Sequence, residues 1–202
     1  MMPPIRLHRF VGHTRAEGPG TRACLWVQGC SIRCAGCFNT HMWDADGGHA
    51  FAAGALTERI VGTSGIEGVT FLGGEPFEQA AALASLARRV RAEGLSVMTF
   101  TGYRYERLAA ADADPDGHAL LAATDLLVDG PYDFRRPDSV RPWVGSTNQR
   151  FWFLSDRYAA LANRLHLLPD RLEVRLRPDG TVFVNGMARR DQLVAMRREV
   201  VG

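Results

Sequence analysis

The chain contains no lysine. All 24 basic residues among its 202 are arginines. Three kinds of chemistry need a lysine amine: Schiff-base formation with a carbonyl substrate, attachment of pyridoxal phosphate, and phosphate binding by a P-loop. The sequence therefore excludes all three.

Long apolar segments and a strong excess of one charge are also missing. No window approaches the roughly 18 consecutive apolar residues of a membrane-spanning helix, and residues 1–10 lack the apolar core of a signal peptide. The formal net charge is only +2, which gives no signature of a nucleic-acid-binding surface. Arginines do cluster, but interspersed acidic residues favour solvated helix faces. We expect a cytoplasmic protein that binds neither membrane nor nucleic acid.

Cysteine is scarce, and three of the four cysteines are packed together. Cys30, Cys34 and Cys37 share one short loop, which indicates a metal site in a reducing compartment rather than a disulfide framework. Iron–sulfur clusters are normally held by four thiolates, so three thiolates leave one iron open to another ligand. The main alternative is a zinc site with His41 as the fourth ligand. Cys24 lies in an apolar run, where a free cysteine behaves as a small hydrophobe, and is not an expected ligand.

Short apolar runs alternate with helical patterns between residues 23 and 154. The pattern predicts a helix from a Thr57 cap, a loop over 12–20 and a turn over 114–117. The other predicted elements are strands over 23–27, 69–72, 95–100, 125–129 and 151–154, and helices over 76–93 and 105–111. Such alternation is typical of parallel βα units.

In parallel sheets, catalytic and binding residues lie mainly in the loops that follow the carboxyl ends of the strands. The cysteine loop, Gly73–Glu75, Thr101–Gly102 and Asp129 all follow such ends, so we expect them to meet in space. The two glycines before Glu75 let a ligand approach the backbone, and the Glu75 carboxylate could take an ammonium group. Alone this is an ordinary strand-to-helix turn. Beside an open cluster it indicates a ligand with both an amino and a carboxylate group.

The order of these motifs resembles a known family. The spacing Cys30-x3-Cys34-x2-Cys37 with a later Gly-Gly-Glu-Pro is similar to the radical S-adenosylmethionine superfamily. More closely, residues 5–150 resemble the activating proteins of anaerobic ribonucleoside-triphosphate reductases, which are glycyl-radical-enzyme activases. The segments that carry this resemblance are 18–22, 30–39, 101–103, 127–130 and 145–149.

The resemblance implies cofactors and the residues that bind them. Cys30, Cys34 and Cys37 would hold three irons of a [4Fe-4S] cluster, and S-adenosylmethionine would chelate the fourth iron. Phe38 would stand near the adenine, because Gly36 occupies the place where many relatives carry an aromatic residue. The residues implied to line the S-adenosylmethionine site are Gly73, Gly74, Glu75, Thr101, Asp129, Phe38 and Asn39.

The same resemblance implies a reaction and partners. Reductive cleavage of S-adenosylmethionine would give a 5′-deoxyadenosyl radical, which takes a hydrogen atom from a glycine of a partner glycyl radical enzyme. The electron would come from a low-potential donor such as flavodoxin or ferredoxin. Two alternatives stay open: a stand-alone radical S-adenosylmethionine enzyme that modifies a small molecule or peptide, and a non-catalytic zinc or iron–sulfur binding module.

The fold predicted is α/β: a partial, open (β/α) barrel of the radical S-adenosylmethionine type over 1–154, with a C-terminal extension over 155–202. The extension is predicted to contain a helix capped by Ser155, a hairpin over 172–184 and a helix over 190–200. It either covers an open sheet edge or provides a surface for a partner or substrate.

Overall fold

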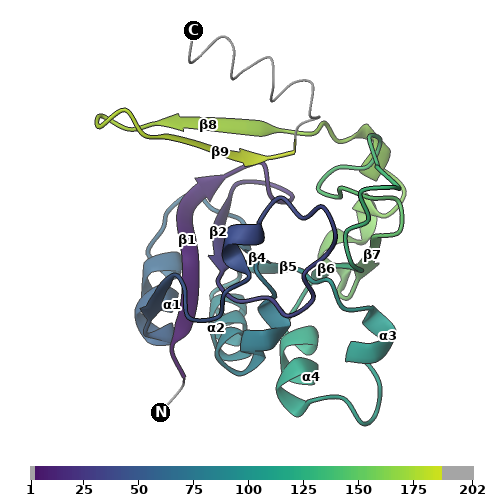
Figure 1. Cartoon of the computed structure of the whole chain (residues 1–202). Helices are drawn as coiled ribbons and strands as arrows, with labels where there is room; N and C mark the ends of the chain where they lie inside the picture. Colours follow the sequence, from purple (N-terminus) through teal and green to yellow (C-terminus); the bar gives the residue numbers. More distant parts are fainter. Residues whose placement is uncertain (1–2, 188–202) are drawn as a thin grey trace, which may run out of the picture.

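The computed structural model describes residues 3–187, and a seven-stranded sheet forms its centre (Figure 1). The strand order is β3-β1-β2-β4-β5-β6-β7. These strands are β1 (Ile5–Thr14), β2 (Arg22–Val27), β3 (His49–Phe51), β4 (Gly68–Gly73), β5 (Ser96–Phe100), β6 (Leu126–Asp129) and β7 (Arg150–Phe153). Strands β2, β4, β5 and β6 are parallel neighbours, whereas β1, β3 and β7 are each antiparallel to the strands they pair with. Within the described residues β3 and β7 are unjoined edges, so the predicted α/β fold with an open, partial barrel is confirmed.

The α-helices cover one face of this sheet (Figure 1). The helical elements are η1 (Thr40–Met42), α1 (Ala53–Val61), η2 (Pro76–Gln79), α2 (Ala80–Ala92), α3 (Tyr105–Leu108), α4 (Pro115–Ala122), η3 (Asp156–Leu161) and η4 (Leu165–Leu167). The main core lies between the sheet and α1, α2 and α4, where Leu25 and Phe71 of the strands join one cluster with Leu83 of α2. No helix in residues 3–187 is long and apolar enough to cross a membrane.

The opposite face of the sheet carries a different set of side chains. Cys24 and Trp26 of β2 belong to one apolar cluster there, and Met98 and Val128 belong to another. A separate hairpin of β8 (Leu172–Leu176) and β9 (Val182–Gly186) lies above the upper end of β1 in Figure 1. The predicted hairpin is therefore confirmed, and Cys24 is buried in a strand as expected.

The sequence pattern does not predict strand β1, and the loop predicted over 12–20 is wrong at its beginning, because the strand continues to Thr14. Its pairing with β2 shifts register between Leu7 and Arg9 and again between Val11 and Thr14. Such bulges break the two-residue alternation that identifies a strand in a sequence.

The predicted turn over 114–117 is wrong, because these residues begin α4. The Asp114 carboxylate caps the helix by accepting a hydrogen bond from the Gly117 N–H (3.1 Å), and Pro115 occupies the first turn. Asp followed by Pro is favoured both in turns and at the start of a helix, so the sequence alone does not distinguish the two. Burial of Leu120 and Leu121 in the core favours the helix.

Other helix boundaries also differ from the predictions. Helix α1 starts at Ala53, so Thr57 lies inside it and donates its hydroxyl to the Ala53 carbonyl (2.8 Å) instead of capping. Helix α3 ends at Leu108 rather than at residue 111. The helix predicted over 76–93 begins as the 3-10 turn η2 before α2.

The described part of the extension packs on the sheet. Ser155 caps its first turn as predicted, but that segment forms η3 and η4 rather than an α-helix. Only Tyr158 and Leu165 are buried in these two turns, too few for an apolar stripe. Tyr158 contacts the cluster of Met98 and Val128. The helix predicted over 190–200 lies outside the described residues, and the division at residue 154 stays a prediction.

Candidate functional site

A cavity of about 180 Å³ lies where the four parallel strands end. Loops that follow β2, β4, β5 and β6 all contribute to its wall. Its lining includes Cys30, Cys34, Cys37, Asn39, Gly73, Gly74, Glu75, Thr101, Gly102 and Gly130. The structure therefore brings the cysteine loop, the Gly73–Glu75 turn and Thr101 together, as the parallel order predicts. Phe38 and Asp129 are not part of this wall.

Backbone hydrogen bonds and one left-handed glycine define the shape of the cysteine loop. The Cys30 N–H donates to the Trp43 carbonyl (3.1 Å), and the Cys37 N–H donates to the Cys34 carbonyl (3.1 Å). Gly36 adopts a φ of 77°, a left-handed conformation that suits glycine. All three thiols are partly exposed, and all three line the cavity.

Burial raises the pKa of the Cys30 and Cys34 thiols, although backbone N–H groups near each sulfur oppose the rise. A bound iron cation reverses this preference, because metal ligation requires the thiolate and releases its proton. Metal binding at Cys30 and Cys34 would therefore release protons.

The donor set fits a cluster better than a single zinc ion. In residues 3–187, no group of three or more His, Cys, Asp or Glu side chains could hold one metal ion. Three thiolates on one zinc at about 2.3 Å would lie about 3.8 Å apart. A cluster instead gives each thiolate its own iron, so the sulfurs need only face one cavity. His41, the proposed fourth zinc ligand, is outside the wall, and its ring lies against that of His8 (4.6 Å between centroids).

Glu75 joins the loops that follow β4 and β5. Its side chain is 1% exposed. The carboxylate accepts hydrogen bonds from the Thr101 hydroxyl (2.8 Å), the Gly102 N–H (2.9 Å) and the Phe77 N–H (3.0 Å). Burial nevertheless raises the pKa of Glu75 to about 7. An ammonium group beside it would favour the ionised form and offset that burial.

Gly73 and Gly74 have a packing role that sequence reasoning did not foresee. A Cβ on Gly74 would lie 2.2 Å from the Gly29 carbonyl oxygen, and one on Gly73 would lie 2.8 Å from the Cα of Trp26. The Gly74 N–H donates to the Val27 carbonyl at the end of β2 (2.8 Å), and the Glu75 N–H donates to the Gly29 carbonyl just before Cys30 (2.7 Å). The turn after β4 therefore sets the position of the loop after β2.

Asp129 lies beneath the site rather than in its wall. Its buried carboxylate accepts bonds from Arg150 of β7 (2.5 and 3.0 Å) and from the Tyr105 N–H (2.6 Å). These contacts connect β6, β7 and α3. The next residue, Gly130, is the one that reaches the cavity. A direct contact of Asp129 with a ligand stays a prediction.

Aromatic residues near the cysteine loop come from two places. Phe38 is 70% exposed and lies 6.0 Å from the Tyr132 ring. Phe134 packs over Gly36, where an added Cβ would come within 3.0 Å of it. Sequence reasoning missed Phe134, because the loop after β6 has no periodic pattern. Gln149, which belongs to one of the segments that carry the resemblance, also lines the cavity.

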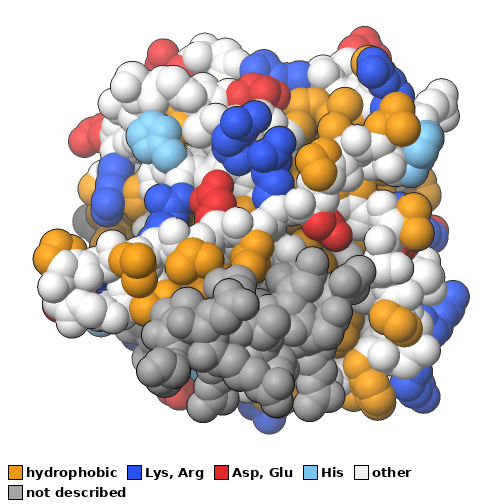
Figure 2. All heavy atoms as spheres, turned by 90° about the horizontal axis from the view of Figure 1, so that it is seen from above, with side chains coloured by type: hydrophobic (Ala, Val, Ile, Leu, Met, Phe, Trp, Pro, Cys, Tyr) orange, Lys and Arg blue, Asp and Glu red, His pale blue; other side chains and the backbone are white. Residues whose placement is uncertain are grey.

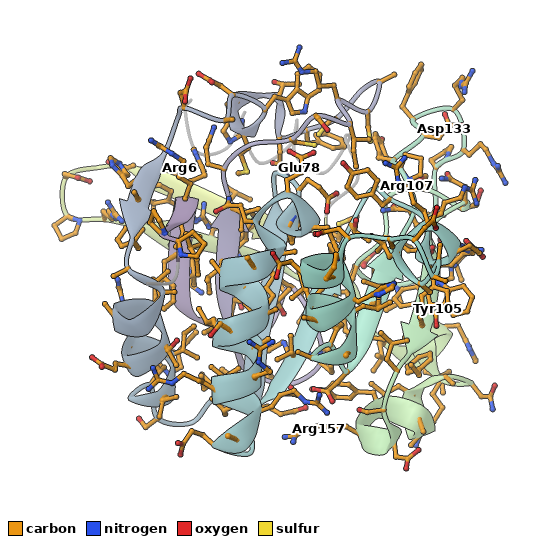
Figure 3. The ribbon with its side chains drawn as sticks, turned by 90° about the horizontal axis from the view of Figure 1, so that it is seen from below. Arg6, Glu78, Tyr105, Arg107, Asp133 and Arg157 are labelled. Carbon is orange, nitrogen blue, oxygen red and sulfur yellow. The ribbon has the colours of Figure 1, made fainter. Side chains whose placement is uncertain are left out.

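Glu78 supports the cysteine loop from η2. One carboxylate oxygen accepts bonds from the Ser31 N–H (2.9 Å) and the Ser31 hydroxyl (2.6 Å). The Tyr103 hydroxyl donates to the same oxygen (3.3 Å). Figure 3 shows Glu78 at the end of the molecule opposite Arg157, where the parallel strands finish. The exposed side of the site is thus held by hydrogen bonds from three segments.

Comparison with known proteins gives three kinds of match. A family model described as a 4Fe-4S single cluster domain matches residues 16–152. The chain is similar to the anaerobic ribonucleoside-triphosphate reductase-activating proteins of Enterobacteria phage T4 (31% identical, covering 69% of this chain and 88% of the relative) and of Vibrio cholerae (31%, 72% and 96%). The protein of that name from Escherichia coli K12 is 30% identical, with coverages of 72% and 96%. Among solved structures, QueE from Escherichia coli covers 62% of this chain and 68% of its own, at 18% identity and a TM-score of 0.41.

Proposed function

The chain belongs to the family of anaerobic ribonucleoside-triphosphate reductase-activating proteins, and we propose that it makes a glycine-centred radical on such a reductase. It is a radical S-adenosylmethionine enzyme whose cofactors are a [4Fe-4S] cluster and S-adenosylmethionine. The observation that carries the proposal is the single cavity lined by Cys30, Cys34, Cys37 and the Gly73–Glu75 turn.

When bound and reduced by an external donor, the cluster would supply the one electron needed for reductive cleavage of S-adenosylmethionine to methionine and a 5′-deoxyadenosyl radical. Transfer of a hydrogen atom from a glycine α-carbon to that radical would give 5′-deoxyadenosine and leave the unpaired electron on the glycine. The cofactors carry this chemistry, and the protein supplies binding, orientation and exclusion of water.

We assign the chain's residues to these tasks. Cys30, Cys34 and Cys37 would each hold one iron, which leaves the fourth iron for the amino and carboxylate groups of S-adenosylmethionine. The Glu75 carboxylate would accept from the amino group, and Thr101 would keep that carboxylate in place through its 2.8 Å hydrogen bond. Gly73, Gly74, Asn39, Phe38 and Asp129 would complete the set of residues that bind S-adenosylmethionine. The Asn39 N–H donates to the Cys37 sulfur (3.3 Å).

We also propose the surroundings in which the protein works. A low-potential donor such as flavodoxin or ferredoxin would deliver the electron at the exposed side of the cysteine loop. A cytoplasmic location would keep the three thiols reduced. Residues 1–154 would form the radical core and 155–202 an extension that packs on it.

The test is electron paramagnetic resonance of the reductase after anaerobic incubation with the reconstituted protein, S-adenosylmethionine and reductant. A glycine-centred doublet on the reductase, formed with about one 5′-deoxyadenosine per radical, is the expected result. Continued 5′-deoxyadenosine release with a small-molecule product and no protein radical would instead assign the stand-alone function. Failure to take up iron and sulfide would refute both.

A further inference from the structure

A second cavity of about 560 Å³ lies between the sheet and the β8–β9 hairpin. Trp26, Leu72 and Phe100 form its floor at the ends of β2, β4 and β5. Asn39, Leu72 and Phe100 also line the cluster cavity, so the two cavities are neighbours that share part of their walls. A molecule held in the second cavity therefore lies next to the cluster cavity.

Strand β9 presents its edge to this second cavity. Six consecutive residues, Val182–Met187, line it, although successive side chains of a strand point to opposite faces. Within the described residues β9 pairs with β8 alone. The wall is therefore a strand edge rather than one face of the hairpin.

The hydrogen-bond pattern shows which backbone groups lie on that edge. Arg177 donates to the Thr181 carbonyl (2.9 Å) and Met187 donates to the Arg171 carbonyl (2.9 Å). Positions of an antiparallel pair alternate between bonded and non-bonded. Val182, Val184 and Gly186 consequently direct their N–H and C=O groups away from β8. Edge groups of this kind are a template for pairing with another strand.

Buried polar contacts fix the edge relative to the sheet. Asn185 is 7% exposed and donates to Glu17 (3.0 Å) and Thr14 (3.1 Å). Its side-chain oxygen accepts from Arg9 (3.1 Å), whose guanidinium also lies over the Trp26 ring (4.7 Å to the centroid). The edge is thus preorganised, which lowers the entropy cost of binding.

We propose that the hydrogen-donating segment of the partner enters as an extended peptide and adds a strand to the free edge of β9. The inference rests on the proposed function, since it assigns the route by which the partner's glycine reaches the cluster cavity. Main-chain bonds to Val182, Val184 and Gly186 would supply affinity with little demand on side chains, as in other cases of strand addition. The apolar floor and the Arg9 donors would suit an uncharged backbone rich in carbonyl acceptors.

The hairpin offers a matched pair of variants. Val184 and Val174 are directly opposite each other, at 39% and 42% exposure, and neither N–H belongs to the hairpin's own ladder. Val184→Pro removes a donor from the proposed docking edge, whereas Val174→Pro removes the equivalent donor from the outer edge of β8. Proline is tolerated at such edge positions.

The experiment measures radical formation on the anaerobic reductase and partner-independent 5′-deoxyadenosine release for both variants and the unchanged protein. We expect Val184→Pro to lower the rate of glycyl radical formation about tenfold, the loss expected for one backbone hydrogen bond. Val174→Pro should keep that rate, and both variants should keep the partner-independent release. Equal radical formation by the two variants would overturn the proposal. No radical with the unchanged protein would refute the proposed function instead.

Amide hydrogen exchange of the unchanged protein gives a second readout that does not depend on folding of a variant. Adding the reductase should slow exchange at Val182, Val184 and Gly186 but not at Val174. Exchange that stays the same would overturn the proposal. Slow exchange before the reductase is added would also overturn it, because the chain itself would then cover this edge. Figure 2 views the molecule from the hairpin side and shows hydrophobic side chains at that surface.

Discussion

At the residue scale, Glu75 couples ligand chemistry to the shape of the site. One buried carboxylate accepts from the loop after β5 and from η2, and its pKa is raised by burial to about 7. An ammonium ligand favours the ionised form, so binding below pH 7 must displace a proton. The same residue therefore positions Thr101 and responds to charge in the cavity.

This gives a pH dependence for S-adenosylmethionine affinity. The dissociation constant of the reconstituted protein should be lowest above pH 7 and rise by up to about tenfold per unit below it. Glu75→Gln should bind more weakly at pH 8 and lose this dependence. Glu58→Gln, at an exposed position of α1, is the control. Isothermal titration calorimetry between pH 6 and 8 measures the dissociation constant of each variant. If the dissociation constant of Glu75→Gln keeps the pH dependence of the unchanged protein, Glu75 does not bind the amino group.

A second residue-scale prediction concerns Gly74. Gly74→Ala should lower the free energy of unfolding by about 1–3 kcal/mol, because its Cβ would meet the Gly29 carbonyl at 2.2 Å. Gly54→Ala in α1 is the matched control, since no atom lies within 4 Å of its Cβ position. Alanine there should raise stability by about 0.5–1 kcal/mol. Urea unfolding of the metal-free protein compares the two, and equal stabilities would contradict the packing account.

At the element scale, the site depends on contacts between loops rather than within them. The η2 turn supports the cysteine loop through Glu78 and Ser31, and the β4 turn supports it through Gly29. Retention of the iron–sulfur cluster should therefore depend on Glu78, although Glu78 is not expected to be an iron ligand. Glu78→Ala should lose its cluster to a chelator several-fold faster than the unchanged protein does.

Glu93→Ala is the control for that measurement, because Glu93 is exposed at the far end of α2. The decay of the cluster's visible absorbance in a chelator gives the rate. A Glu78→Ala protein that keeps its cluster as long as Glu93→Ala does would show that the cysteine loop holds its shape without η2.

At the scale of the whole molecule, the sequence predicts the alternating strands and helices. It does not predict positions that depend on contacts between residues far apart in the chain. Alternating strand and helix patterns were enough to place three loops at one end of a parallel sheet. Strand β1 was missed because two bulges interrupt its pattern. The position of Asp129 could not be read either, since it is set by Arg150 from a strand 21 residues away. The contact of Asn185 with Glu17 likewise depends on how the hairpin docks.

The central claim is that three cysteines hold a cluster whose fourth iron binds S-adenosylmethionine. Its most direct test is 5′-deoxyadenosine release under reductant by Cys34→Ala, compared with Cys24→Ala, whose thiol is buried in β2 away from the cavity. The account predicts that Cys34→Ala cleaves no S-adenosylmethionine while Cys24→Ala retains cleavage. Full cleavage by Cys34→Ala would contradict it.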